Sequence, residues 1–255
     1  MNLWKIKGGS LELIKVLLFK KNDNRKIYKL YIYKINMEET IKIDDKYLKG
    51  LESFGIPYII IKNNSINEKD FDYVPELGFY VAKERKLLRK NWFDSQNELH
   101  SKNEKMLTLP EFKEYLKFVR ENNKEIYDEI TKVKSPWRAE WLDADFKTQG
   151  KNLIVNYNTF EDGKIVQKSA VLDKDTLMKD KTPGISLENW LEDSTPQGLP
   201  SENIKLGDLF YWYPRSDNNS VARFSADDDR ADLDCVRYPS GRDDFLGVRA
   251  AKLRE

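Results

Sequence analysis

Residues 221–246 read VARFSADDDRADLDCVRYPSGRDDFL, and their composition differs from that of the rest of the chain. The stretch holds seven of the 23 aspartates but none of the 20 glutamates. It holds four of the 12 arginines and none of the 32 lysines, and Gln, Met and Trp are also missing. Folding gives no reason to exclude Glu and Lys while admitting Asp and Arg. A surface network of Asp and Arg would explain the charge balance but not the missing residue types.

A strand alternation underlies this composition. Ala231, Leu233 and Cys235 are small or apolar and fall on one face of a predicted strand. Asp232, Asp234 and Val236 fall on the other face. We expect that face to be exposed. The inner set suits a packed core, whereas the outer set follows no packing rule.

Five further segments complete a resemblance to a known family. The chain resembles the variable proteins of diversity-generating retroelements, especially archaeal and candidate-phylum members, which have a C-type-lectin-like fold related to that of formylglycine-generating enzymes. The resemblance covers roughly residues 75–255. Besides 221–246, it rests on residues 135–146 (SPWRAEWLDADF), 183–186 (PGIS), 211–213 (YWY), 218–224 (NNSVARF) and 246–251 (LGVRAA).

The resemblance implies a mechanism for the unusual composition. In such systems an error-prone reverse transcriptase randomises adenines copied from a template, often in Asn codons. Randomising the first two bases of AAC or AAT cannot yield Lys, Glu, Gln, Met or Trp, and all five of these types are absent from this stretch. We therefore interpret these positions as diversified: Ser225, Asp227, Asp228, Asp229, Asp232, Asp234, Val236, Tyr238, Gly241, Asp243, Asp244 and Phe245. Arg230 and Ser240 are further candidates, and Gly241 is alternatively a fixed position.

By this resemblance the protein is a binding scaffold and not an enzyme. Residues 73–255 would form an α+β, C-type-lectin-like domain that displays the diversified side chains, within a variable segment spanning 221–249, to a macromolecular partner. We expect the partner to be a protein that the sequence does not identify. The aromatic residues Tyr238 and Phe245 are expected to anchor it, and the many aspartates favour a basic partner surface.

Residues 1–72 carry no motif of this family and are predicted to form a basic, β-rich α+β accessory region. Residues 1–70 hold fourteen Lys and Arg against nine Asp and Glu. The polar stretch 63–72 is the expected boundary. A nucleic-acid-binding module is an alternative here, although a solvated Lys-rich surface is the commoner case. We expect a short helix over 45–54 and strands over 11–19, 26–35 and 56–61.

Local signals predict further elements after this boundary. Thr108 and Glu111 have the spacing of a capping box, which predicts a helix that starts near Pro110. Trp137 and Trp141 lie four residues apart, and we expect at least one of them to anchor the core. Further helices are predicted over 123–133 and 186–191, and strands over 79–81, 152–158, 164–171 and 209–213.

Catalytic constellations are poorly represented in the chain. An enzyme of the sulfatase-modifying type, on the same broad fold, is the rival hypothesis, but it depends on catalytic cysteines and the chain has one Cys. A Cys–His pair would need His100 beside Cys235. We expect Cys235 to be a small buried hydrophobe and His100 an exposed side chain. No nucleophile elbow, phosphate-binding loop or dinucleotide fingerprint occurs.

The acidic clusters suggest a hard cation such as calcium, which prefers carboxylate oxygens. The spacing from Asp227 onward fails the EF-hand pattern, with no Gly at its sixth position and no Glu at its twelfth. Asp143 and Asp145 offer another pair of carboxylates, two residues apart. Surface ion pairs or turn caps explain both groups more simply, so we predict no metal and no cofactor. The calcium motifs of C-type lectins are absent, so the resemblance does not imply calcium-dependent sugar binding.

The overall composition excludes several classes of protein. The chain has 255 residues, of which 40% are hydrophobic and 34% charged, so it can bury a core and is not expected to be disordered. Its formal net charge of +1 disfavours a surface devoted to nucleic acid or membrane. No apolar window approaches the length of a membrane span, and Lys5, Lys7 and Lys15 interrupt any signal-peptide core. We therefore expect a cytoplasmic protein.

Overall fold

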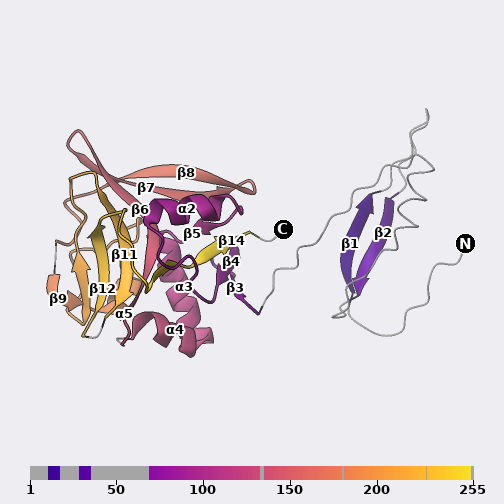
Figure 1. Ribbon diagram of the computed structural model, residues 1–255, viewed down its shortest axis with the longest axis horizontal. Helices are drawn as coiled ribbons and strands as arrows, with labels where there is room; N and C mark the ends of the chain where they lie inside the picture. Colours follow the sequence, from indigo (N-terminus) through magenta and orange to yellow (C-terminus); the bar gives the residue numbers. More distant parts are fainter. Residues whose placement is uncertain are drawn as a thin grey trace, which may run out of the picture. The chain divides into compact units, whose positions relative to one another are not determined.

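The computed structural model describes residues 11–17, 29–35, 69–132, 135–179, 181–227 and 229–253. The chain divides into two units, Met1–Asn64 and Ser65–Glu255, which are described separately (Figure 1). In the first unit β1 (Leu11–Leu17) pairs antiparallel with β2 (Lys29–Ile35), which confirms two predicted strands. The predicted helix 45–54 and strand 56–61 lie outside the described residues. The nucleic-acid hypothesis for this region concerns side chains that are also outside them, and it stays a prediction.

The second unit is mixed α+β with more strand than helix, which confirms the predicted class at that level. Its described helices are α2 (Trp92–His100), α3 (Leu109–Asn122), α4 (Lys124–Thr131) and α5 (Leu187–Glu192). The strands of its larger sheet are β6 (Arg138–Gln149), β7 (Asn152–Glu161), β8 (Lys164–Leu172), β9 (Lys181–Ile185), β10 (Leu209–Trp212), β11 (Ser220–Ala226), β12 (Ala231–Arg237) and β13 (Leu246–Val248). The smaller sheet comprises β3 (Phe71–Val74), β4 (Phe79–Ala82), β5 (Lys105–Met106) and β14 (Ala250–Lys252).

The larger sheet places the variable segment at its centre. Its strand order is β8-β7-β6-β11-β12-β10-β9, and β13 pairs with β6 beside this path. The pairs β10–β12 and β6–β13 are parallel, and the other pairs are antiparallel. The smaller sheet has the order β3-β4-β14-β5, so the last strand of the chain returns to pair with strands from the start of the unit (Figure 1).

Helix α3 begins at the predicted capping box. The Thr108 hydroxyl accepts a hydrogen bond from the Glu111 backbone N–H at 3.4 Å, and Glu111 Oε2 accepts one from the Thr108 N–H at 2.8 Å. These bonds satisfy two donors that a helix start leaves unpaired. The apolar residues Phe112, Leu116 and Val119 recur at helical spacing and are fully buried, which confirms the predicted inner face.

The helices cover the two faces of the larger sheet unequally. Helices α3, α4 and α5 contribute to one core cluster, where Phe224 of β11 packs against Phe112 and stacks on Trp190, with ring centroids 5.2 and 6.3 Å apart. Helix α2 contributes to a second cluster through Trp92, beside Trp141 of β6. Trp141 is 2% exposed, so the expected tryptophan anchor is confirmed.

Sequence patterning does not predict α2, because only two of its buried residues, Trp92 and Leu99, are apolar. Its last residue, His100, is half-buried and not exposed as expected, since α2 packs onto β5. Burial, followed by the charge of Lys105, lowers the pKa of His100. None of the helices in the described ranges is long and apolar enough to cross a membrane.

Candidate ligand-binding face

Within the variable segment, β11 and β12 form an antiparallel hairpin. Alternate residues of the two strands share one face of the larger sheet. Arg223 of β11 lies opposite Asp234 of β12, and Ser225 lies opposite Asp232. Residues paired across neighbouring strands share a face. We call the face that carries these four residues the β11–β12 face. The same rows continue onto β10 and β6, with Trp212 opposite Asp234 and Trp141 opposite Arg223.

The inner positions of β12 lie where the sequence predicts. Leu233 and Cys235 are fully buried in the main core cluster, and Ala231 is 8% exposed. Cys235 is therefore the small buried hydrophobe that was expected. This inner face packs against the helices, so the opposite face is the one on which variation would be accommodated.

The outer positions fall into three groups. Asp229, Tyr238, Asp244 and Phe245 are exposed, and Asp227, Val236, Gly241 and Asp243 are half-buried. Ser225, Asp232 and Asp234 are buried, which contradicts the expected exposure of the outer set. Asp228 lies outside the described residues.

Arginines explain why the two aspartates are buried. Asp234 Oδ2 lies 2.7 Å from Arg237 Nε and 3.4 Å from an Arg223 guanidinium nitrogen. Asp232 Oδ1 lies 3.3 Å from Arg230 Nε. Arg223 is itself buried, whereas the side chains of Arg230 and Arg237 are 37% and 47% exposed. The charge of these two aspartates is therefore already paired within the chain, and their expected attraction to a basic partner stays a prediction.

The electrostatics of the face reflect its partial removal from water. Burial raises the pKa of Asp232 above its usual value, and the nearby Arg230 and a hydrogen bond from Trp212 oppose that rise. Burial likewise lowers the pKa of Arg223, against the attraction of Asp234. In both residues desolvation disfavours the charged form more than the partner favours it.

Two aromatic residues of the variable segment reach solvent beside this arrangement. Phe245 is 38% exposed, and its ring packs edge-on against Trp137 with centroids 6.1 Å apart. Arg223 lies over the other ring of this pair, 5.6 Å from the centroid of Trp137. Tyr238 is 53% exposed, and the Arg215 guanidinium lies 4.3 Å from its ring centroid. Each exposed ring is thus held in place by a neighbour from outside the diversified set.

The loop between β12 and β13 is fixed by polar contacts. Arg89 Nε lies 2.7 Å from a carboxylate oxygen of Asp244, and the Phe245 N–H donates to Asp243 Oδ1 at 3.0 Å. The Gly241 N–H donates to the Tyr238 carbonyl, also at 3.0 Å. A Cβ atom at Gly241 would lie 3.2 Å from that carbonyl oxygen, so larger residues would have to displace it. This crowding favours the alternative that Gly241 is a fixed position.

An open hollow of ≈ 760 Å³ lies next to the β11–β12 face. Val236 of the diversified set lines it, together with Trp212, Tyr213, Arg215 and Lys174. Its lining combines aromatic and cationic side chains, whereas the diversified positions are mostly acidic. The hollow therefore adds residues outside 221–246 to the candidate face.

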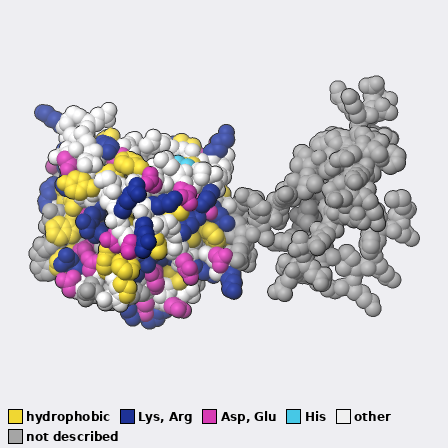
Figure 2. All heavy atoms as spheres, in the orientation of Figure 1, with side chains coloured by type: hydrophobic (Ala, Val, Ile, Leu, Met, Phe, Trp, Pro, Cys, Tyr) yellow, Lys and Arg dark blue, Asp and Glu magenta, His cyan; other side chains and the backbone are white. Residues whose placement is uncertain are grey.

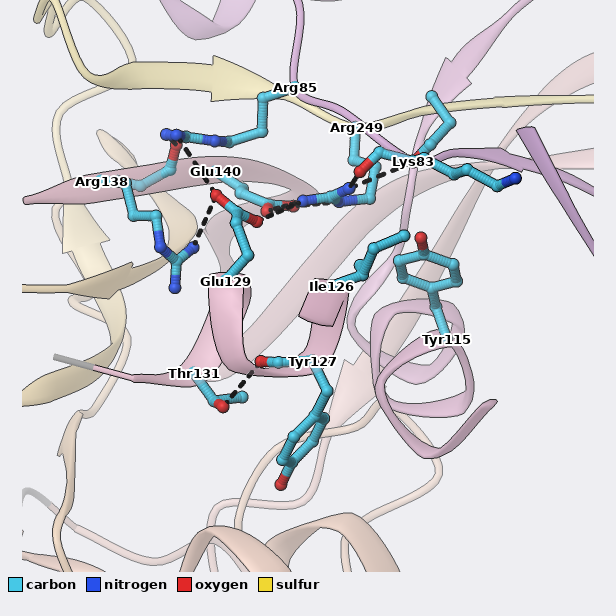
Figure 3. A network of polar contacts seen from close by, with 12 residues as sticks. Lys83, Arg85, Tyr115, Ile126, Tyr127, Glu129, Thr131, Arg138, Glu140 and Arg249 are labelled. Atoms are coloured by element: carbon cyan, nitrogen blue, oxygen red, sulfur yellow. Dashed lines mark hydrogen bonds and ion pairs between the residues drawn. The ribbon is translucent and has the colours of Figure 1, made fainter. Parts of the chain in front are cut away.

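Figure 3 shows a second cluster of arginines and carboxylates. Its Glu140 lies opposite the inward-facing Phe224, so it belongs to the other face of the same sheet. Arg249 donates to both carboxylate oxygens of Glu140, at 2.7 and 3.1 Å, and lies 3.1 Å from Glu129 of α4. Arg85 and Arg138 each lie 3.5 Å from Glu129. The sequence marks Arg249 as part of a shared motif but does not indicate its partners.

Of the other aspartate pair, Asp143 differs from the prediction and Asp145 agrees with it. Asp143 of β6 is 1% exposed, so it does not form a surface ion pair. Its carboxylate accepts hydrogen bonds from the Asn158 backbone and side chain, and burial raises its pKa to about 7. Asp145 pairs with Lys147 at 2.8 Å, in line with the ion-pair hypothesis. Within the described residues, no three His, Cys, Asp or Glu side chains are grouped to hold a metal ion.

Sequence reasoning assigned no role at the candidate face to four residues that border it: Trp137, Arg215, Arg223 and Arg237. The preference for Arg over Lys in 221–246 was the available signal, because an arginine can pair with a carboxylate and stack on a ring together. In the view of Figure 2, basic, acidic and hydrophobic side chains are interspersed over the second unit. Comparison with protein-family models, with curated proteins and with solved structures found no match for this chain. The function must therefore be argued from the site.

Proposed function

We propose that this chain is a ligand-binding variable protein of the diversity-generating retroelement type. Its second unit is a C-type-lectin-like domain, and the β11–β12 face with the adjoining loop recognises a macromolecular partner, a protein. The observation that carries the proposal is a coincidence of two patterns in 221–246. Residue types unreachable from randomised Asn codons are missing there, and alternate positions of β12 are buried core while their neighbours face away from it.

The exposed aromatics are the part of the face best suited to supply affinity. Tyr238 and Phe245 each present a large apolar surface that is already ordered by Arg215 and Trp137. Rings held in place lose little conformational freedom on binding, and tyrosine and other aromatic residues are frequent hot spots. We therefore assign Tyr238 and Phe245 as anchors and Trp137 as fixed support for Phe245.

The exposed acidic positions have a different role in this proposal. Asp229 is exposed, and its side chain is 74% accessible although Arg230 lies 3.4 Å away. Charges at the rim of an interface mainly affect the rate of association and its salt dependence. Asp229 and Asp227 therefore steer encounter with the partner, whereas the buried Asp232 and Asp234 do not.

The proposal is tested by a graft at the exposed and half-buried positions of the diversified set. Replacing them with another set of residues, with Asp232, Asp234, Ser225 and Gly241 kept, should leave a cooperatively folded protein that no longer binds partners captured by the parent. Tyr238→Ala and Phe245→Ala should each weaken binding to a captured partner by about 2 kcal/mol, which is roughly thirtyfold.

Tyr73→Ala is the matched control, since Tyr73 is an exposed ring, 45% accessible, on β3 of the other sheet. It should leave affinity unchanged. If the graft binds the same partners as tightly as the parent, the binding site lies elsewhere and the proposal is wrong.

A further inference from the structure

Three arginines surround the two buried aspartates of the β11–β12 face. Asp234 lies 2.7 Å from Arg237 and 3.4 Å from Arg223, and Asp232 lies 3.3 Å from Arg230. The three guanidinium groups come from outside the twelve positions that the composition marks. The two carboxylates, in contrast, belong to that set. A cationic frame, in which Arg230 alone is a further candidate for diversification, therefore encloses two positions whose residues are interpreted as variable.

The polar groups of this frame are incompletely satisfied. Arg223 is 4% exposed and Ser225 1%, yet Arg223 Nε and Ser225 Oγ are buried with no hydrogen-bond partner among the described residues. Asp232 Oδ1 is also buried without a hydrogen bond, although Arg230 lies within ion-pair distance. Buried polar atoms are paired in most proteins, because an unpaired one loses its hydration without gaining a hydrogen bond. Their concentration at one place indicates a site adapted to bind a polar group.

Aromatic rings hold two of the guanidinium groups from one side. Arg223 lies over Trp137 at 5.6 Å, and Arg230 lies over Phe210 at 5.2 Å. A guanidinium stacked on a ring keeps the N–H groups at its edge available, and their forked geometry matches the oxygens of a carboxylate or a phosphate. The frame thus presents oriented donors without using all of them internally.

We propose that Arg223, Arg230 and Arg237 form an oxyanion-binding site that Asp232 and Asp234 occupy from within this chain. The residues at 232 and 234 then decide what the site takes. Aspartate closes it, whereas a neutral residue leaves the guanidinium groups free for a carboxylate or phosphate group of a ligand. The consequence for partner choice rests on the proposed function of this face, but the anion site itself does not.

Chemical rescue tests the site directly in the full chain. Asp234→Asn removes a carboxylate from the frame while keeping the shape of the side chain. We expect the variant to melt below the parent, and millimolar acetate or phosphate to restore at least about half of the lost melting temperature, relative to chloride at equal ionic strength. Rescue by acetate identifies a carboxylate as the preferred group, and rescue by phosphate identifies a phosphate.

Asp244→Asn is the matched control. Asp244 pairs with Arg89 at 2.7 Å, but both side chains are more than half exposed, so no enclosed frame is left behind. Neither this variant nor the parent should respond to acetate or phosphate. An equal response in all three proteins, or no response in Asp234→Asn, overturns the proposal.

Asp232→Asn covers the case in which Asp234→Asn gives no cooperative melting transition. Its partner Arg230 has a side chain that is 37% exposed, so the loss of the pair is less damaging. Acetate or phosphate should then raise the melting temperature of Asp232→Asn, or restore a cooperative transition to Asp234→Asn. If neither variant responds, the anion site is contradicted. The result is independent of partner binding, so it distinguishes failure of this inference from failure of the proposed function.

Discussion

The two faces of the central sheet each bury an arginine against a carboxylate, but with different completeness. On the face covered by α3, α4 and α5, Arg249 and Glu140 share two hydrogen bonds of 2.7 and 3.1 Å, and each side chain is 1% exposed. On the β11–β12 face, Arg223 and Asp234 approach at 3.4 Å with side chains that are 5% and 7% exposed. Arg249 also donates to the carbonyls of Ala82 and Lys83, whereas Arg223 Nε has no partner among the described residues. The Arg249–Glu140 pair therefore stabilises the fold, whereas Arg223 is suited to exchange Asp234 for another anionic partner.

The protonation behaviour of the two faces differs in the same direction. Burial alone would raise the pKa of Glu140, but the charge and hydrogen bonds of Arg249 outweigh it, and the pKa is lowered. For Asp232 burial outweighs the attraction of Arg230, and the pKa is raised. An ion pair thus stabilises its charged form only where its geometry compensates for lost hydration.

The largest expected effect on the free energy of unfolding is at the Arg249–Glu140 pair. Arg249→Met leaves Glu140 buried without its partner, so it should lower the free energy of unfolding by about 3–5 kcal/mol, measured by urea denaturation. Arg89→Met, which breaks the exposed pair with Asp244, should cost no more than about 1 kcal/mol. A loss below about 1 kcal/mol in Arg249→Met would remove the distinction between the two faces.

An intermediate effect is expected for the buried aspartates of the β11–β12 face. Asp232→Asn and Asp234→Asn should each cost about 1–3 kcal/mol, because each leaves a guanidinium with fewer partners. Asp227→Asn and Asp229→Asn, at more exposed positions of the same hairpin, should change stability by no more than about 0.5 kcal/mol. Equal effects in the two groups, measured by the same denaturation, would show that burial does not distinguish these carboxylates.

The pH dependence of stability should differ in sign between the faces. The pKa of Glu140 is below its usual 4.5 in the folded protein. Its contribution to the free energy of unfolding is therefore present above pH 4.5, and it is lost as the pH falls through the lower, folded pKa. The pKa of Asp232 is above its usual 3.8, so its contribution is present below pH 3.8 and is lost as the pH rises through the higher, folded value.

Denaturation curves of the parent, Glu140→Gln and Asp232→Asn over this range check the difference. The stability advantage of the parent over Glu140→Gln should shrink on acidification. Its advantage over Asp232→Asn should shrink on going from pH 3.8 toward neutrality. Parallel curves for the two variants would contradict the opposite shifts.

The smallest effect on stability is expected at the exposed anchors. Tyr238→Ala and Phe245→Ala should each change the free energy of unfolding by no more than about 1 kcal/mol, since these rings lie outside the two core clusters. Thermal melting of both variants beside the parent measures this. A loss comparable to that of Arg249→Met would mean that the loop supports the fold and is not free to vary.

Much of the second unit was predictable, because its signals are local. The capping box at Thr108 fixes the start of α3, and the alternation at Leu233 and Cys235 identifies the inner face of β12. Helix α2 was not predictable in this way, since few of its residues are apolar and its Trp92 bonds to the Leu142 carbonyl of β6, which is distant in sequence.

The composition of 221–246 leads to a hypothesis about which positions vary, but it does not indicate where their side chains lie. An aspartate in a strand was expected to be exposed, and the burial of Asp232 and Asp234 depends on Arg223, Arg230 and Arg237. Pairing across strands decides such burial, and the spacing of residues along one strand does not encode it. The partners of Arg249 were hidden for the same reason, since Glu140 lies far from it in the sequence.

The central claim is that variation in this protein is confined to one face while the opposite face is held constant. Sequencing the codons for residues 221–249 from many cells of one population tests it most directly. We predict that substitutions concentrate at the diversified positions, differ from a nearby template at its adenines, and spare Leu233, Cys235 and Arg249. Substitutions spread evenly over the segment, including these three residues, would contradict the account.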